Sequence, residues 1–166
     1  MAVKTQSSKP APEAQLRSLI DRLDPKVQKI FRSVRTALRK RFPTANELAY
    51  DYSSFVVIGY SPTEQGIESF VSIAGRPDGV QLYFNHGPQL PDPKKLLLGS
   101  GKQTRFVRVE AARQLAHPDI KAFIAAAMDL SKPLPSQGKG SLIIKTFKAA
   151  AKKKKRPGRS SARQRK

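Results

Sequence analysis

Apolar residues in the first part of the chain recur with the period of an α-helix. In residues 14–23 they lie three or four positions apart, and residues 25–42 keep that spacing over a longer run. Asp24 stands where a helix N-cap is expected, and Pro25 suits the first turn that follows. Pro43 ends the pattern. The sequence therefore predicts two consecutive helices, the second of which carries a basic face opposite its apolar one.

After this point the chain changes to short runs rich in Val, Ile, Tyr and Phe. Four such runs cover 47–52, 54–60, 66–75 and 79–87, and turn-forming residues separate them. A fifth run, 103–110, alternates between apolar and polar positions. Short connections join antiparallel neighbours, so we expect a roughly five-stranded antiparallel sheet.

Helical signals return on both sides of the fifth run. Residues 91–99 predict a short helix that Asp92 caps and Gly99 ends in the left-handed conformation. Residues 111–116 predict one or two helical turns, and His117 opens a last helix. The predicted fold class is α+β, with N-terminal and C-terminal helices packed on the sheet.

Polar and low-complexity segments bound this region. Residues 1–13 are polar and contain proline, which predicts a disordered leader and places the α+β domain at 14–131. Residues 132–166 predict a basic linker and tail, largely disordered. Within them, 141–155 predicts a short basic amphipathic helix.

The distribution of charge along the chain says more about binding partners than the overall composition does. The 166 residues carry a formal net charge of +20, and thirteen Lys or Arg but no Asp or Glu lie from residue 131 onward. Such a surplus attracts polyanions, so we expect the tail to contact nucleic acid without reading its sequence. If about eight tail charges contact phosphates, the logarithm of affinity on duplex DNA should fall against the logarithm of salt with a slope near −7. The tail residues expected to do this are Lys152, Lys153, Lys154, Lys155, Arg156 and Arg159.

The sequence lacks the residue patterns that several classes of enzyme and metal-binding protein require. The chain has no cysteine, and its two histidines, His86 and His117, do not have the spacing of metal ligands. The acids do not cluster, and no serine stands in a G-x-S-x-G setting. We therefore expect a protein that is not an enzyme and uses no cofactor. No apolar run suits a signal peptide or a spanning helix, so a cytoplasmic location without membrane contact is expected.

The stretch LLLGSGKQTRF, residues 96–106, raises the question of a nucleotide site. A P-loop of the form G-x-x-x-x-G-K-[ST] would need glycine at position 96, a hydroxyl at position 103 and a following helix. The chain has Leu and Gln at those positions, and a strand pattern follows. These failures exclude a nucleotide loop and favour a simple turn. An anion site stays open, in which Gly99 and Gly101 expose N–H groups beside Lys102 and Arg105.

Two aromatic residues could belong to the same anion site. Tyr50 and Tyr52 share one face of the first predicted strand. Core packing is the favoured interpretation for aromatic residues in strands. The functional alternative is a groove in which both tyrosines surround a small acidic ligand together with Lys102 and Arg105.

The run from residue 78 to residue 109 contains a recognisable combination of positions. A strand ends in an aromatic residue and glycine, Leu-x-Asp-Pro follows, and a leucine-rich turn then leads to Gly-x-Gly-Lys and an arginine that heads the last strand. These positions are Phe84, Gly87, Leu90, Asp92, Pro93, Leu97, Leu98, Gly99, Gly101, Lys102 and Arg105. The end of the second helix at Phe42-Pro43, followed by Glu47 and Tyr50, adds to the pattern.

This combination resembles the YdhG-like domain family of small bacterial domains, over about residues 14–130. The resemblance implies an α+β fold in which helices pack on an antiparallel sheet. Members of this family are sometimes described as frataxin-like iron chaperones, so the resemblance also implies iron handling.

The sequence thus favours a domain that binds a small ligand or partner through the sheet and the Gly-Lys turn, with a tail that attracts nucleic acid. Two alternatives stay open. One is an intracellular iron carrier, whose iron binding would depend on Glu47, Asp51 and His86. The other is a sequence-independent DNA- or RNA-binding protein in which the domain is only a scaffold.

Overall fold

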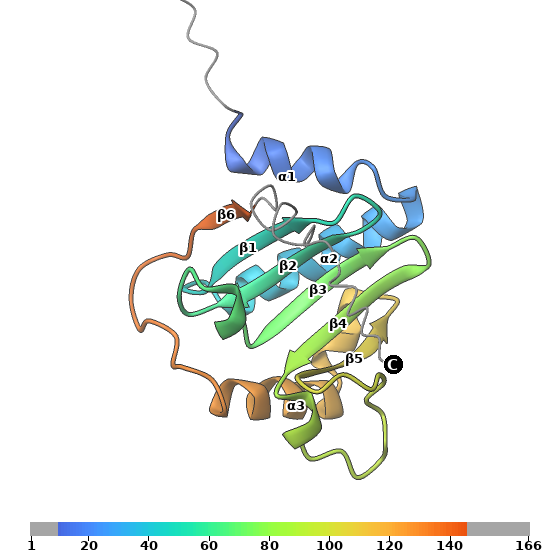
Figure 1. The fold of residues 1–166 in the computed structure, drawn as a ribbon, viewed down its shortest axis with the longest axis vertical. Helices are drawn as coiled ribbons and strands as arrows, with labels where there is room; N and C mark the ends of the chain where they lie inside the picture. Colours follow the sequence, from blue (N-terminus) through green and yellow to red (C-terminus); the bar gives the residue numbers. More distant parts are fainter. Residues whose placement is uncertain (1–9, 146–166) are drawn as a thin grey trace, which may run out of the picture.

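Two helices begin the part of the chain that the computed structural model describes, residues 10–145. They are α1, Pro12–Ile20, and α2, Pro25–Arg41 (Figure 1). The Asp24 carboxylate caps α2 by accepting a hydrogen bond of 2.9 Å from the backbone N–H of Lys26. The predicted helices and the predicted cap are confirmed.

Five strands then form an antiparallel meander, as the alternating runs predict. Their bounds are β1 Asn46–Asp51, β2 Val56–Ser61, β3 Val71–Arg76, β4 Gly79–Asn85 and β5 Thr104–Val109. Short 3₁₀ segments, η1 Gly66–Glu68 and η2 Gly87–Gln89, lie in the connections. The α+β fold class is therefore confirmed.

A sixth strand corrects the sequence prediction at the sheet edge. β6, Leu142–Lys145, pairs in parallel with β1 and gives the order β5-β4-β3-β2-β1-β6. The helix predicted for 141–155 is wrong where the structure describes it, because the Ile143-Ile144 pair favours extended backbone and completes the hydrogen bonds of the β1 edge. The boundary predicted at residue 131 thus leaves out one strand of the sheet. The six tail cations lie outside the described residues.

The short helix predicted for 91–99 is also wrong. The Asp92 carboxylate accepts hydrogen bonds from the N–H groups of Leu96 and Leu97, at 2.8 and 2.9 Å, so it closes a loop. Lys95 adopts a φ of 55°, which interrupts helical geometry between these residues. Leu98 then pairs with β5 in an isolated bridge, so this segment is an extended loop beside the sheet edge.

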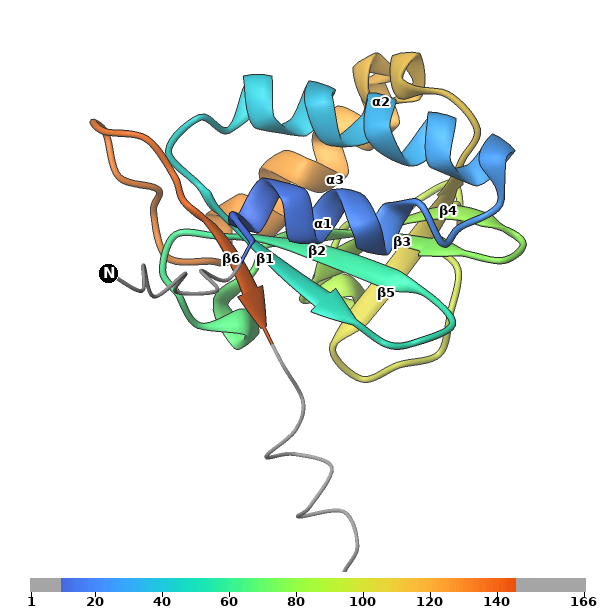
Figure 2. The same ribbon diagram turned by 90° about the horizontal axis from the view of Figure 1, so that it is seen from above.

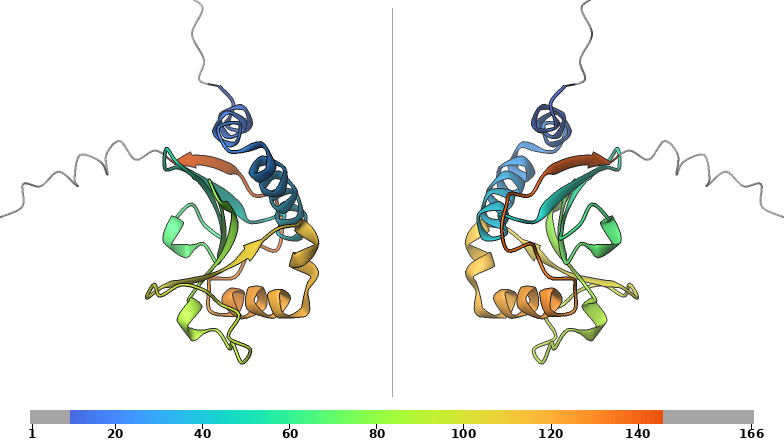
Figure 3. Two further views of the ribbon diagram at one scale, coloured as in Figure 1. Left: turned by 90° about the vertical axis from the view of Figure 1, so that its right-hand side faces the viewer. Right: turned by 90° about the vertical axis from the view of Figure 1, so that its left-hand side faces the viewer.

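The remaining elements complete one helical layer. η3, Ala112–Ala116, and α3, Pro118–Asp129, confirm the turns and the last helix that the sequence predicts. Figures 2 and 3 show α1, α2 and α3 on the same face of the sheet, while η1 stands on the opposite face. Gly75 lets α2 lie close to β3, since a Cβ there would come within 2.9 Å of the Phe31 ring. None of the helices within residues 10–145 combines the length and the apolar character needed to cross a membrane.

Candidate functional site

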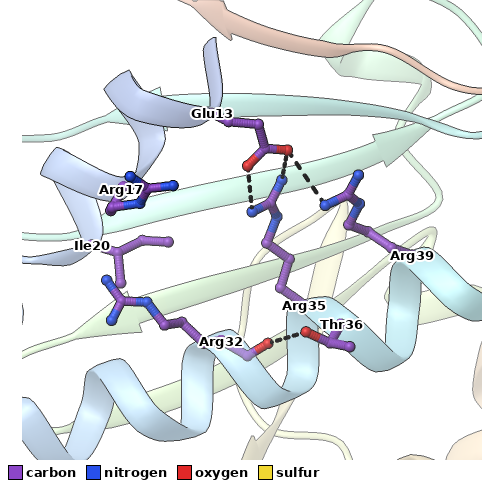
Figure 4. Close-up of a pocket in the computed structure, with 7 residues that line it drawn as sticks. All are labelled: Glu13, Arg17, Ile20, Arg32, Arg35, Thr36 and Arg39. Atoms are coloured by element: carbon purple, nitrogen blue, oxygen red, sulfur yellow. Dashed lines mark hydrogen bonds and ion pairs between the residues drawn. The ribbon is translucent and has the colours of Figure 1, made fainter. Parts of the chain in front are cut away.

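The basic face of α2 lines a cleft because α1 lies beside it. Arg32, Arg35 and Arg39 are three and four positions apart, so they project from one side of the helix. Arg17 of α1 lines the same cleft, which has a volume of about 400 Å³ (Figure 4). We call it the arginine cleft, and its lining residues are Glu13, Arg17, Ile20, Arg32, Arg35, Thr36 and Arg39.

A buried carboxylate behind the cleft fixes the central arginine. Glu47 of β1 is only 5% exposed. Arg35 donates to it through Nε and Nη2, both at 2.9 Å, and the Tyr60 hydroxyl donates to the same carboxylate at 2.9 Å. Because these donors satisfy the carboxylate, its burial is compensated and the position of Arg35 is tied to the sheet.

The same carboxylate also sets the protonation state of its partners. Burial and the neighbouring charge of Glu47 raise the pKa of Tyr60 well above its ordinary value, so the hydroxyl stays protonated and donates. Burial alone would lower the pKa of Arg35, but its hydrogen bonds to Glu47 and Glu13 outweigh that effect and raise it. Arg35 is therefore a permanent cation at the floor of the cleft.

Glu13 covers the outer edge of Arg35. Its carboxylate accepts hydrogen bonds from Nη1 and Nη2 of Arg35 at 3.1 and 2.9 Å, and lies 3.4 Å from Nη1 of Arg39. Figure 4 shows both arginines rising from α2 toward it. The hydrogen bond from Arg35 lowers the pKa of Glu13, whose side chain is 49% exposed. The rim of the cleft thus already holds one anionic group, supplied by the chain itself.

The end of the cleft near Arg17 offers guanidinium N–H donors that no described residue accepts. Arg32 bonds to Asp21 at 2.6 Å and to Gln28 at 3.2 Å. The guanidinium of Arg17 forms no hydrogen bond or ion pair with another residue among 10–145. A guanidinium presents donors in a planar fork that matches phosphate and carboxylate oxygens. The arrangement can therefore bind an anion that reaches from Arg17 toward Arg39.

The glycine turn predicted as an anion site has a different internal arrangement. Gly99 has a φ of 100°, and a Cβ at that residue would approach the Phe106 ring at 3.2 Å. The Arg105 guanidinium donates to the backbone carbonyls of Gly101 and Thr104. Lys102 is exposed. The structure thus brings these four predicted residues together where the loop enters β5, and Arg105, within β5, supports the loop backbone.

The two predicted tyrosines lie elsewhere. Tyr50 and Tyr52 belong to β1 and the turn after it, on the sheet face that the helices leave uncovered, with ring centroids 6.2 Å apart. Tyr52 is 42% exposed, so the core packing favoured from sequence does not hold for it. The sheet order places β1 four strand spacings from β5, or about 19 Å at ~4.8 Å per spacing. Residues 10–145 therefore do not form the predicted groove that combines the tyrosines with Lys102 and Arg105.

The residues that the iron alternative requires are also separated. Glu47 is held by Arg35 and Tyr60, and Asp51 pairs with Arg22 at 2.5 Å. His86 follows β4, in the left-handed region, at a φ of 58°. Nowhere in the described part of the chain do three His, Cys, Asp or Glu side chains converge where they could hold a metal ion.

The sequence pattern indicates the basic face of α2 but does not reveal the cleft. The spacing of Arg32, Arg35 and Arg39 was a usable signal. The contributions of Glu13 and Arg17 depend on how α1 lies beside α2, and no local pattern specifies that arrangement. No protein-family model, curated protein or solved structure matches this chain.

Proposed function

We propose that this domain is a non-enzymatic binding module that holds a phosphate-bearing anion in the arginine cleft. The observation that carries the proposal is the convergence of four arginines from two helices on one cleft of about 400 Å³. That volume falls within the ~300–1,000 Å³ of typical small-molecule sites. Arg17 supplies donors that no described residue uses.

The cleft is suited to binding rather than to catalysis. Its lining offers one hydroxyl, Thr36, and no histidine or cysteine. Thr36 donates its hydroxyl hydrogen to the Arg32 carbonyl at 2.9 Å. The only carboxylate in the lining, Glu13, is engaged by arginines, and arginine does not act as a general acid near neutral pH.

Calorimetric titration with pyrophosphate tests the proposal. We expect Arg17→Ala and Arg39→Ala each to weaken pyrophosphate binding about tenfold or more, because each removes a charge-assisted contact. The matched control is Arg108→Ala, which removes an exposed arginine of β5 that pairs with Asp78 and does not line the cleft. The absence of pyrophosphate binding, or an equal loss in the Arg108 variant, would contradict the proposal.

A second candidate function is sequence-independent nucleic-acid binding through the tail. The observation that favours it is the charge of residues 146–166, which hold ten Lys or Arg and no acid. Replacement of Lys152, Lys153, Lys154 and Lys155 by Gln should weaken binding equally for unrelated oligonucleotide sequences, since phosphate contacts carry no sequence information. A loss confined to one sequence would contradict this candidate.

A further inference from the structure

The arginine cleft shares one lining residue, Arg39, with a second cavity. This cavity has a volume of about 520 Å³ and lies between the C-terminal end of α2 and the segment that leads into β6. Its lining residues are Arg39, Lys40, Phe42, Pro43, Ala45, Glu47, Gly138, Lys139, Gly140 and Leu142. We propose that the two cavities form one groove, the polyanion groove, which binds the backbone of a single-stranded nucleic acid. This inference rests on the proposed anion binding by the arginine cleft.

The charges along the groove favour a ligand with several negative groups. Six Lys or Arg line it, namely Arg17, Arg32, Arg35, Arg39, Lys40 and Lys139, against the two acids Glu13 and Glu47. Both acids are already engaged by Arg35. Lys40 and Lys139 form no ion pair with any residue in 10–145, so their charges are available. The unused cations therefore lie at both ends of the groove.

The length of the groove exceeds what one phosphate can contact. Arg32 and Arg39 are seven residues apart on α2, or about 10 Å at ~1.5 Å per residue, and the second cavity extends the groove further. Each nucleotide of a strand carries one phosphate, so a strand that lies along this distance presents more than one phosphate to the groove. A single phosphate would leave one end of the groove unoccupied.

The shape and lining of the groove favour a single strand over a duplex. Arg35 lies at the floor of the groove with its side chain 13% exposed, whereas Arg17, Arg39, Lys40 and Lys139 are exposed along its rim. A flexible single strand can follow such a line of cations, whereas a duplex presents its phosphates on a broad convex surface that would reach only the rim. Leu142 lines the second cavity and is half-buried, so a small apolar surface lies beside the cations, whereas Phe42 in the same lining is only 5% exposed. Proteins that bind single strands track the backbone with a positively charged groove, which is the part of such binding that the polyanion groove would supply.

The test uses the full chain and an oligodeoxythymidylate of about twelve nucleotides, in anisotropy titrations at several salt concentrations. In Lys40→Gln/Lys139→Gln, the log–log salt slope should become less negative by about 1.4, because two single-strand phosphate contacts at ~0.7 each are lost. The control, Arg113→Gln/Lys121→Gln, removes two exposed cations of η3 and α3 and should keep the wild-type slope. The tail is the same in both variants, so their difference reports the groove.

Pyrophosphate separates this inference from the proposed function. Lys40→Gln/Lys139→Gln should bind pyrophosphate as the wild type does, since neither lysine lines the arginine cleft. Equal slopes in the two double variants, with pyrophosphate still bound, would overturn the groove and leave the anion site. Failure of the wild-type protein to bind pyrophosphate would overturn the proposed function and the inference that rests on it. Equally tight binding of a polyglutamate of matched charge would overturn the choice of nucleic acid.

Discussion

At the scale of single residues, Glu13 occupies the rim position that an anionic ligand of the arginine cleft would take. Its carboxylate already accepts two hydrogen bonds from Arg35. A ligand must therefore displace it or share Arg35 with it. We expect Glu13→Gln to strengthen pyrophosphate binding about three- to fivefold, because removing a half-exposed competing charge changes the free energy by about 0.5–1 kcal/mol.

The control for this prediction is Glu110→Gln, which neutralises an exposed acid beyond the end of β5. It should leave the pyrophosphate affinity unchanged. Weaker binding by the Glu13 variant would show that Glu13 positions the arginines for the ligand instead of competing with it.

The same carboxylate predicts a dependence of stability on pH. Arg35 lowers the pKa of Glu13 in the folded protein, and Arg22 lowers the pKa of Asp51 in the same direction. A group with a lowered folded pKa stabilises the fold above its unfolded pKa, about 4.3 for Glu, and loses that contribution as pH falls through the folded value. We expect Tm to fall on acidification through this range, and less steeply in Glu13→Gln. A variant whose Tm falls as steeply as that of the wild type would contradict this origin.

Residue-level prediction from sequence succeeded where the determinant was local. Asp24 caps α2 because a cap depends only on the next few residues. Glu47 could not be recognised as a buried ion-pair partner, because a Glu in an amphipathic strand is usually exposed. Its burial depends on Arg35 and Tyr60, which are twelve and thirteen positions away in the sequence.

At the scale of elements, β6 and the loop 91–103 show where the sequence pattern was insufficient. A short apolar run such as Leu142–Ile144 fits a helix or a strand equally well, and only the unpaired edge of β1 decides between them. In the loop, Asp92 and the prolines beside it satisfy helix-start rules. The Asp92 side chain instead closes a turn on Leu96 and Leu97.

The position of β6 predicts unequal effects of two truncations. Removing residues 146–166 leaves every described strand in place, so Tm should be unchanged within about 1 °C. Removing 132–166 also removes β6, which exposes the edge of β1 and the apolar surface that Leu142 and Ile144 cover. We expect this shorter chain to lose about 2 kcal/mol, or roughly 4–8 °C in Tm, and to self-associate through the exposed edge.

A point variant tests whether the lower Tm comes from the lost pairing of β6 or only from the shorter chain. A Cβ at Gly140 would overlap the Ala45 carbonyl, so Gly140→Ala should force the start of β6 away from β1 and lower Tm like the longer truncation. Gly101→Ala is the matched control, because its Cβ would meet only ordinary contacts of 3.4 Å or more. Equal Tm values for the two variants would contradict this account of the edge.

At the scale of the whole molecule, positive charge is divided between two regions that differ in composition. All 12 acids lie within residues 10–145, where 20 of the 32 Lys and Arg also lie, and ten more cations follow after Lys145 without any acid. In the first region acids form ion pairs with cations such as Arg22, Arg35 and Lys94, whereas no acid stands near the second region in the sequence. Nucleic-acid binding should therefore have two components of different strength.

Ending the chain at Lys145 separates these components, because it removes the ten tail cations and leaves β6 intact. If about eight tail cations and about three groove cations contact phosphates at ~0.7 each, the salt slope on single-stranded DNA should change from roughly −8 to roughly −2. A slope that stays at its full value would show that the domain makes all the contacts. A slope of zero would show that the groove makes none, since the described domain alone would then release no counterions.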